Sequence, residues 1–222
     1  MSSNSVIEQA LQLPSGAAFR RCALQVNPAD YAETYRGESV GTDEAEYNRS
    51  LVAKCVELGI DAVAVTHHNS VAGVDALASA AAEEGVVVFP GFEAASSEGV
   101  HVLCLYEPGT PKDQLERYLG QLGIHELGST TDLADNTLCE LIECVQEKQK
   151  GLCIAAHTTN AKGLFSVLSG TARINAWQNP KLLAVQIPGG VDDAPGNIRP
   201  ILKNKNADYC RRPSAGEDLA VA

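Results

Sequence analysis

Side chains that could bind a metal ion follow the apolar segments of this 222-residue chain. His68 comes two residues after the segment Ile60–Thr66, Glu93 follows Val86–Phe89, and His157 directly follows the segment LCIAA. Imidazole and carboxylate together suit Zn²⁺, Mn²⁺ or Fe²⁺ better than Ca²⁺ or Mg²⁺. Burying several such groups side by side is costly without a charged partner or a metal ion. The pattern therefore predicts a polar site and favours a metal site.

Further polar residues have a similar placement, and they are Gln25, Asn27, His67, Asn69 and Gln186. Parallel barrels and open α/β sheets bind ligands at the carboxyl ends of their strands. His101 differs because it begins the segment HVLCLY, and we expect a turn between Glu93 and Gly99 to return it to the same edge. A single histidine at such a place is more often a hydrogen-bonded filler residue than a ligand. The convergence of several is what indicates a site.

The elements that must position these residues alternate along the chain. Strands are expected at Ala18–Val26, Ile60–Thr66, Val86–Phe89, His101–Tyr106, Leu152–Ala156 and Leu182–Ile187. Helices are expected between Thr42 and Gly59, at Gly73–Glu84, Lys112–Leu122 and Asp132–Lys150, and near Ala161–Leu168. This alternation predicts an α/β fold with a largely parallel sheet covered by helices. A barrel-like arrangement is favoured over an open doubly wound sheet, although fewer strands are visible than the eight of a complete barrel.

Composition excludes several classes of protein. The net charge of -11 argues against a protein that coats nucleic acid, because neutralising phosphates requires a basic surface. A basic cluster near the end of the sequence is interpreted as a solvated tail, and it contains Lys203, Lys205, Arg211 and Arg212. No signal peptide and no apolar run long enough for a membrane span is visible. Seven cysteines without a C-x-x-C pair suit a reducing compartment, so we expect a cytoplasmic protein.

The stretch Leu58–Glu93 resembles the PHP (polymerase and histidinol phosphatase) superfamily, whose pattern is strand, T-D-H-D turn, helix, strand and P-G-x-E. His101 matches the histidine that heads the next strand of that family, and His157 matches its A-H-P segment. The resemblance implies a distorted (β/α)7-type TIM-like barrel that holds up to three metal ions over a phosphoester. It also implies that Glu93, His101 and His157 are the ligands of one ion and that His68 is a ligand of another.

Departures from the family pattern reduce the expected number of ions. Both histidines of the opening D-x-H-x-H motif are amides here, at Gln25 and Asn27. The aspartates that flank His68 in the family are replaced by histidine and asparagine, the expected late glutamate is Gln186, and the final G-[ST]-D-x-H motif is absent. Amides are poor ligands for Zn²⁺. We therefore expect one or two ions of Zn, Mn or Fe.

The segment RRCALQVNP also resembles the amino-terminal PHP domain that precedes SMC-like ATPase modules, some of which serve in antiviral defence. Residues 1–222 are accordingly expected to form one PHP-like domain of a longer protein. Glu217–Ala222 resembles the start of a further strand, which fits a barrel that is incomplete at its carboxyl end. A P-loop is absent from the sequence, so an ATPase partner module would lie elsewhere in that longer chain.

Two functions remain open from the sequence. The first is metal-assisted hydrolysis of a nucleotide or nucleic-acid phosphoester, in which His68 or His67 binds a second ion or donates a proton to the leaving group. Asp192 and Asp193 could add a ligand, but a solvated acidic turn is the favoured interpretation. The second is a catalytically impaired scaffold or sensor that binds a nucleotide, a nucleic-acid end or an ATPase module. A nucleic-acid substrate would have to be bound without a general basic surface.

Overall fold

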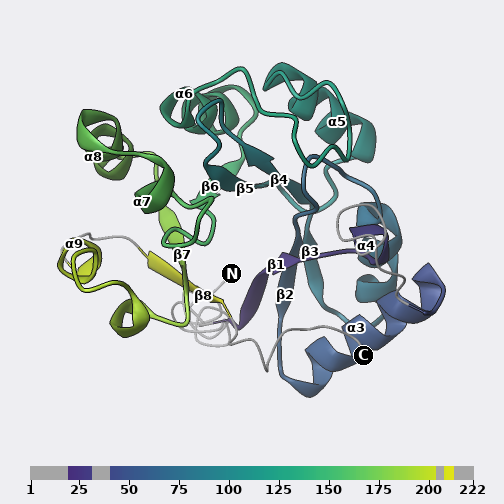
Figure 1. Ribbon diagram of the computed structural model, residues 1–222. Helices are drawn as coiled ribbons and strands as arrows, with labels where there is room; N and C mark the ends of the chain where they lie inside the picture. The colour runs from purple at the N-terminus through teal and green to yellow at the C-terminus, as the bar shows by residue number, and fades with distance from the viewer. Residues whose placement is uncertain (1–19, 32–40, 204–207, 213–222) are drawn as a thin grey trace, which may run out of the picture.

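The computed structural model describes residues 20–31, 41–203 and 208–212, and in the last of these ranges only the backbone. Strands in the first part of the chain are β1 (Cys22–Val26), β2 (Ala62–Val65), β3 (Val87–Phe89), β4 (Gly91–Ala95) and β5 (His101–Leu105). Those in the second part are β6 (Leu152–Ala155), β7 (Ala184–Pro188) and β8 (Asp208–Arg212). Figure 1 shows the strands gathered around the middle of the molecule and the helices outside them.

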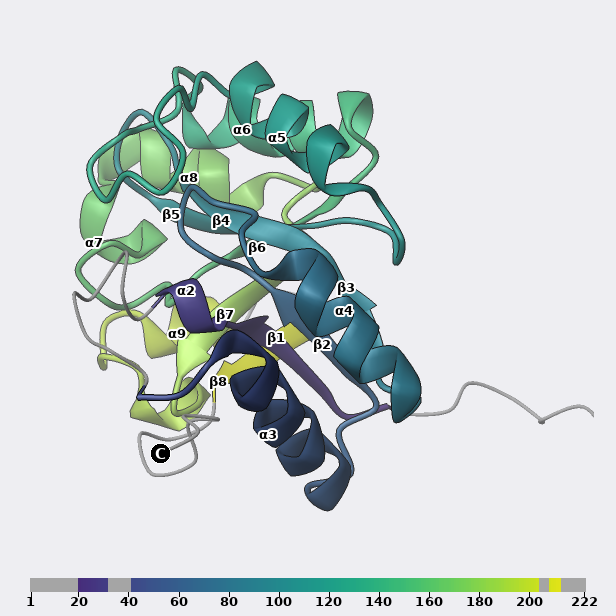
Figure 2. The ribbon, with the colours of Figure 1, turned by 90° about the vertical axis from the view of Figure 1, so that its right-hand side faces the viewer.

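The longer helices are α3 (Glu44–Glu57), α4 (Val74–Glu83), α5 (Lys112–Gln121) and α8 (Gly170–Gln178). Shorter ones are α2 (Ala29–Tyr31), α6 (Leu138–Glu143), α7 (Leu164–Val167) and α9 (Arg199–Lys203). A π-helical turn, Cys144–Lys148, extends α6, and a 3₁₀ turn spans Val191–Asp193. Figure 2 shows α3 and α4 lying side by side in front of the strands β1 to β3.

The first sheet has the order β1-β2-β3 and is parallel throughout. Its central strand has the sequence AVAV and is buried on both faces, as expected for a parallel strand with cover on each side. The ladder between β1 and β2 is irregular, because its register shifts between Ala23 and Val26. Gln25 lies within this irregularity.

The second sheet has the order β4-β5-β6-β7-β8, and β5 runs antiparallel to both of its neighbours. The expectation of a largely parallel sheet therefore fails at this strand. Only residues 96–100 connect β4 to β5, and a connection this short can form a hairpin but cannot cross over to a parallel position. Within the hairpin Ala95 pairs with His101, so His101 returns to the edge expected from the sequence.

Alternation along the strands separates two hydrophobic clusters. Val63, Val65, Val102 and Cys104 belong to the large cluster, which also includes buried residues of the helices. Residues that alternate with these along the strands belong to a second cluster, here called the interior cluster, to which both sheets contribute. It consists of Ala64, Leu103, Leu105, Ile154 and Ala156, with Leu24, Phe89 and Ala184 packed against them. Because successive side chains of a strand point to opposite faces, the second cluster marks an interior that the two sheets share.

The two sheets meet at two places, since the edge strand β8 contacts the edge strand β1, and the edge strand β4 contacts β2, the central strand of the first sheet. A single bridge pairs His68 with Glu93 where the sheets meet. The ladders of the described residues nevertheless form two separate sheets rather than one closed barrel. The structure is thus a mixed α/β fold, and the finer prediction of a (β/α)7 barrel is not confirmed by its sheets.

Other expectations differ from the structure in local ways. Strand β3 ends at Phe89, close to where it was expected, but a further strand that was not expected, β4, begins at Gly91 in the second sheet. An added Cβ at Gly91 would overlap the carbonyl oxygen of Cys104. The helix expected at Asp132–Lys150 begins only at Leu138, behind a capping box formed by Thr137. Helix α8 and strand β8 were not expected, and part of the basic segment interpreted as a solvated tail pairs with β7. The strand expected at Glu217–Ala222 lies outside the described residues.

None of the helices in the described residues is long and apolar enough to cross a membrane. The expectation of a cytoplasmic protein remains a prediction, as does the assignment of residues 1–222 to one domain of a longer protein.

Candidate metal centre

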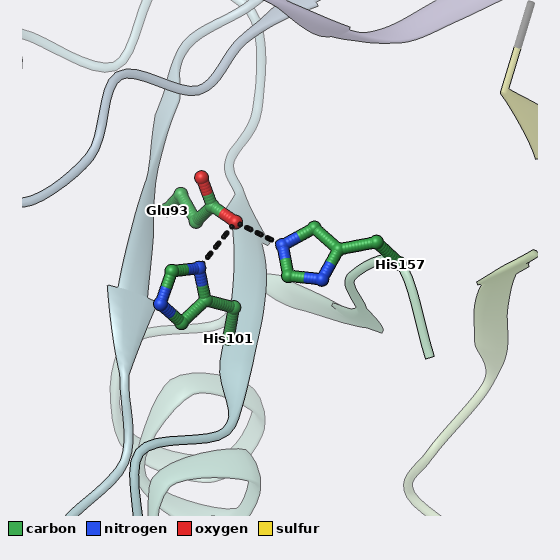
Figure 3. Close-up of side chains that lie close together, drawn as sticks. All are labelled: Glu93, His101 and His157. Carbon is green, nitrogen blue, oxygen red and sulfur yellow. Dashed lines mark hydrogen bonds and ion pairs between the residues drawn. The ribbon is translucent and has the colours of Figure 1, made fainter. Parts of the chain in front are cut away.

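Glu93, His101 and His157 meet at one end of the interior (Figure 3). Oε1 of Glu93 lies 3.0 Å from Nδ1 of His101 and 3.2 Å from Nε2 of His157. The three candidate ligand atoms all lie within 4.8 Å of one another. Glu93 and His101 are buried, and the side chain of His157 is 13% exposed. Residues that are 64 positions apart in the sequence thus share one polar cluster.

Strand alternation explains why these side chains point inward. Phe92 and Ala94 belong to the large cluster, so Glu93 between them faces the interior that the two sheets share. His101 lies on the same face of β5 as Leu103, which belongs to the interior cluster. His157 lies just beyond the carboxyl end of β6, where its left-handed backbone, with φ 28°, turns the chain.

The pKa of Glu93 is set by two opposing effects. Burial raises the pKa of this carboxyl group, but the hydrogen bonds from His101 and His157 outweigh burial and lower the pKa of Glu93 to about 2. The group therefore remains an anion at any pH at which the protein is expected to work. An ionised carboxylate beside two imidazoles has the charge and the lone pairs that a divalent cation requires.

The separations within the cluster fit a common metal ion. Zn²⁺ binds histidine nitrogen and carboxylate oxygen at about 2.0–2.2 Å, which places the ligands of a tetrahedral ion about 3.4 Å apart. The separations of 3.0 and 3.2 Å are close to this value. Two imidazoles and one glutamate also form a known catalytic zinc set that leaves a coordination position open.

His68 lies beside this cluster, with its ring centroid 4.9 Å from that of His101. Its Nδ1 is 3.3 Å from the carbonyl oxygen of Ser129, and a carbonyl can only accept a hydrogen bond. Nδ1 therefore carries the proton, and Nε2 carries the lone pair. Burial lowers the pKa of His68, which favours this neutral form.

Asn69 lies outside the cluster and fastens a loop next to it. Its side-chain amide donates to the carbonyl oxygens of Ser129, at 3.1 Å, and Asp132, at 2.8 Å. Its backbone N–H donates to the carbonyl of Glu93, and its carbonyl accepts from Gly128. Asn69 has φ 48°, a left-handed conformation that asparagine tolerates better than most residues. Through Ser129 this loop also provides the acceptor for His68.

His67 points to a different set of partners. Its Nε2 lies 3.3 Å from Oδ2 of Asp30, and its ring meets Tyr31 edge-on at a centroid distance of 5.3 Å. The side chain is fully buried, and burial lowers the pKa of His67 although Asp30 opposes this effect. The structure therefore gives His67 a carboxylate partner outside the Glu93 cluster.

The two amides at family ligand positions bind each other. Nε2 of Gln186 donates to Oε1 of Gln25 at 2.8 Å, and Oε1 of Gln186 accepts the backbone N–H of His157, also at 2.8 Å. Asn27 offers its backbone carbonyl to the hydroxyl of Tyr47. The sequence placed these amides near the site but gave no sign that they pair.

Three contributing residues were not expected from the sequence, and they are Asp30, Ser129 and Asp132. Ser129 and Asp132 contribute backbone carbonyls, which leave no residue-type signal in a sequence. Asp30 follows the first strand closely, and its position three residues after Asn27 was a usable signal. Asp192, considered as a ligand, is exposed and pairs with Lys203 at 3.1 Å, which agrees with a solvated turn.

No model of a known protein family matches the chain, and no curated protein matches its sequence. Solved structures do match its fold. A provisionally assigned metal-dependent phosphoesterase from Bifidobacterium adolescentis is 17% identical, with a TM-score of 0.54 over 85% of this chain and 83% of its own. An amidohydrolase from Chromobacterium violaceum, with bound sulfate, is 14% identical, with a TM-score of 0.54 over 90% of both chains.

The lesion-specific endonuclease PfuEndoQ from Pyrococcus furiosus is 14% identical, with a TM-score of 0.58 over 87% of this chain and 48% of its own. The chain thus spans about half the length of that enzyme. At these identities the likenesses show the fold, which is consistent with the PHP superfamily, as the resemblance in the sequence predicted. The link to SMC-like ATPases stays a prediction.

Proposed function

We propose that this chain is a metal-dependent phosphoesterase that holds a divalent cation between Glu93, His101 and His157. The observation that carries this proposal is the meeting of three suitable ligand atoms within 4.8 Å at one end of a shared interior. The fold likeness to a metal-dependent phosphoesterase and an endonuclease supports the choice of reaction. The finer barrel architecture implied by the PHP resemblance belongs to the same proposal.

The roles of the residues follow from their protonation. A bound Zn²⁺, Mn²⁺ or Fe²⁺ would polarise a phosphoryl oxygen and acidify a water molecule. Glu93 contributes the negative charge that balances the cation, because its pKa of about 2 keeps it ionised. His101 and His157 would contribute nitrogen ligands, and the burial of the cluster would keep bulk water from weakening these interactions.

His68 assists from the side of His101. With its proton on Nδ1, directed at Ser129, it can use Nε2 to accept a proton or to bind a second ion. This protonation state suits a general base or a ligand better than a proton donor to the leaving group. His67 has a less direct role, since its ring contacts Asp30 and Tyr31.

The proposed substrate is a nucleotide or nucleic-acid phosphoester. An endonuclease shares the fold, while the net charge of -11 argues that a nucleic acid would be held locally rather than along a broad basic surface. A cytoplasmic location, an ATPase module in the same longer chain and a role in antiviral defence complete the proposal. The location rests on the cysteine usage of the sequence, and the ATPase module and the defence role rest on the resemblance in the sequence alone.

A second function, a scaffold or sensor without catalysis, is favoured by one specific observation. Gln25 and Gln186 stand where the family pattern has metal ligands, yet they bind each other. A centre that has lost these ligands could bind a nucleotide or a partner without cleaving it.

Reconstitution with metal separates the two functions. Chelator-treated protein would be loaded with Zn²⁺, Mn²⁺ or Fe²⁺ and tested on bis(p-nitrophenyl) phosphate. We expect hydrolysis that depends on added metal, that disappears in His157→Ala and that persists in His125→Ala, because His125 is the exposed histidine away from the cluster. Metal-loaded protein without hydrolysis would favour the scaffold. Hydrolysis that survives in His157→Ala would contradict the proposed site.

A further inference from the structure

The Gln25–Gln186 amide pair connects β1 and β7, two strands of different sheets, next to the metal-binding cluster. Its orientation follows from the backbone. The N–H of His157 can only donate, so the atom of Gln186 that faces it must be the carbonyl oxygen Oε1. Nε2 of Gln186 is then the atom that faces Gln25, and Oε1 of Gln25 must accept from it. The hydrogen bond between the two side chains therefore runs from Nε2 of Gln186 to Oε1 of Gln25.

His157 is held in a conformation that requires support. A φ of 28° is a strained backbone conformation for a residue with a Cβ and costs about 1–3 kcal/mol. Gln186 supplies support on both sides of the strained residue. Its side chain accepts from the N–H of His157, and its backbone carbonyl accepts from both the N–H and the hydroxyl of Thr158.

We propose that Gln25 and Gln186 are positioning residues that hold His157 with Nε2 directed at Glu93. The two amides are engaged with each other and with the backbone, and amide groups are poor ligands for Zn²⁺. We therefore take His68 as a general base rather than as a ligand, and the centre holds one ion. The positioning role rests on the metal site proposed above. A positioning role differs from that of lost metal ligands, because both glutamines then orient His157 even in the metal-free protein.

Substitutions at the two positions distinguish these roles. Gln186→Met keeps the side-chain length but removes the acceptor of the His157 N–H. Gln25→Met leaves that acceptor in place and removes only its support. Gln186→Glu retains an acceptor for His157, and Gln25 can turn its amide to donate to the new carboxylate. Gln149→Met is a matched control, because Gln149 is equally buried and hydrogen-bonded but binds Tyr106.

The first measurement needs no metal. Amide hydrogen exchange at His157, followed by NMR in the presence of a chelator, should accelerate by about 10–100-fold in Gln186→Met and by less in Gln25→Met. It should stay at the wild-type rate in Gln186→Glu and in Gln149→Met, after correction for global stability. An unchanged rate in Gln186→Met would overturn the positioning role, whether or not the protein binds metal. Should that variant fail to fold, an unchanged rate in Gln25→Met would be equally decisive.

The second measurement is calorimetric titration with Zn²⁺. We expect one ion per wild-type chain and an affinity about 10–100-fold lower in Gln186→Met, which is typical for the loss of a group that orients a ligand. Gln186→Glu should still bind one ion with near wild-type affinity. Two ions per chain in the wild type or in Gln186→Glu would overturn the one-ion centre. A wild-type protein that binds no zinc would refute the proposed function, while the exchange experiment would still decide the positioning role.

Discussion

The carboxylate of Glu93 should make a large and pH-dependent contribution to the stability of the metal-free protein. Its pKa falls from 4.5 to about 2 on folding, and each pKa unit corresponds to about 1.4 kcal/mol. The ionised group therefore stabilises the fold by about 3 kcal/mol relative to its protonated form. Because the folded pKa is the lower one, this stabilisation is complete above pH 4.5 and is lost as the pH falls toward 2.

Replacing Glu93 by glutamine removes the charge and keeps the shape. At pH 6.5 we expect the free energy of unfolding to fall by about 3 kcal/mol, since both histidines lose an anionic acceptor. The difference in the free energy of unfolding between wild type and variant should narrow by about 1.4 kcal/mol for each pH unit below 4.5. It should therefore be about 2 kcal/mol at pH 3.5.

Urea unfolding with a chelator present, followed at several pH values between 6.5 and 3.5, measures this difference. Glu83→Gln serves as a control for the loss of a carboxylate, because Glu83 is exposed on α4. Parallel pH profiles for wild type and Glu93→Gln would refute the assignment of a strongly depressed pKa to this residue. They would also show that the histidines do not donate to it in solution.

Two further substitutions test the elements around the centre. Gly91→Ala should destabilise the fold by about 2 kcal/mol or more and displace β4, because its Cβ would overlap the carbonyl oxygen of Cys104. The control is Gly120→Ala on α5, where an added Cβ has open space, and this variant should be neutral or stabilising in thermal unfolding. Asn69→Asp should cost about 2 kcal/mol by replacing an amide that donates to two carbonyls with an acceptor, and it should speed hydrogen exchange within residues 126–135. Unchanged exchange in that range would mean that Asn69 does not fasten the loop.

Much of the fold was predictable because its strands are apolar and short. The segments around β2, β5 and β6 carry residues suited to burial on both faces, and such runs are typical of covered sheets. The antiparallel course of β5 was harder to predict, since alternation and composition are the same in either direction. Only the length of the connection between Ala95 and His101 decides it.

The helix boundaries near residues 132–137 illustrate a second limit. Asp132 was included in a helix, but its carboxylate accepts the backbone N–H groups of His125 and Glu126 and holds an irregular loop. The helix begins at Leu138, where Thr137 and Glu140 form a reciprocal cap. Both interactions are present together and oppose helix formation in residues 132–137, and the sequence pattern alone did not reveal them.

The candidate site could be predicted in part from the types of polar side chain and from their positions at the ends of the expected strands. His101 and His157 were expected near Glu93, and the structure brings all three together. The separation of His67 from this group could not be predicted, because adjacent residues after a strand point in different directions. The pairing of Gln25 with Gln186 depends on contact between strands 161 positions apart, which no local pattern records.

The central claim is that Glu93, His101 and His157 share one cation. Anomalous diffraction at the zinc edge, from crystals grown with Zn²⁺, tests it most directly. We expect a single peak about 2.0–2.2 Å from Oε1 of Glu93, Nδ1 of His101 and Nε2 of His157. The absence of a peak among these three side chains in zinc-saturated crystals, or a stronger peak elsewhere in the chain, would contradict it.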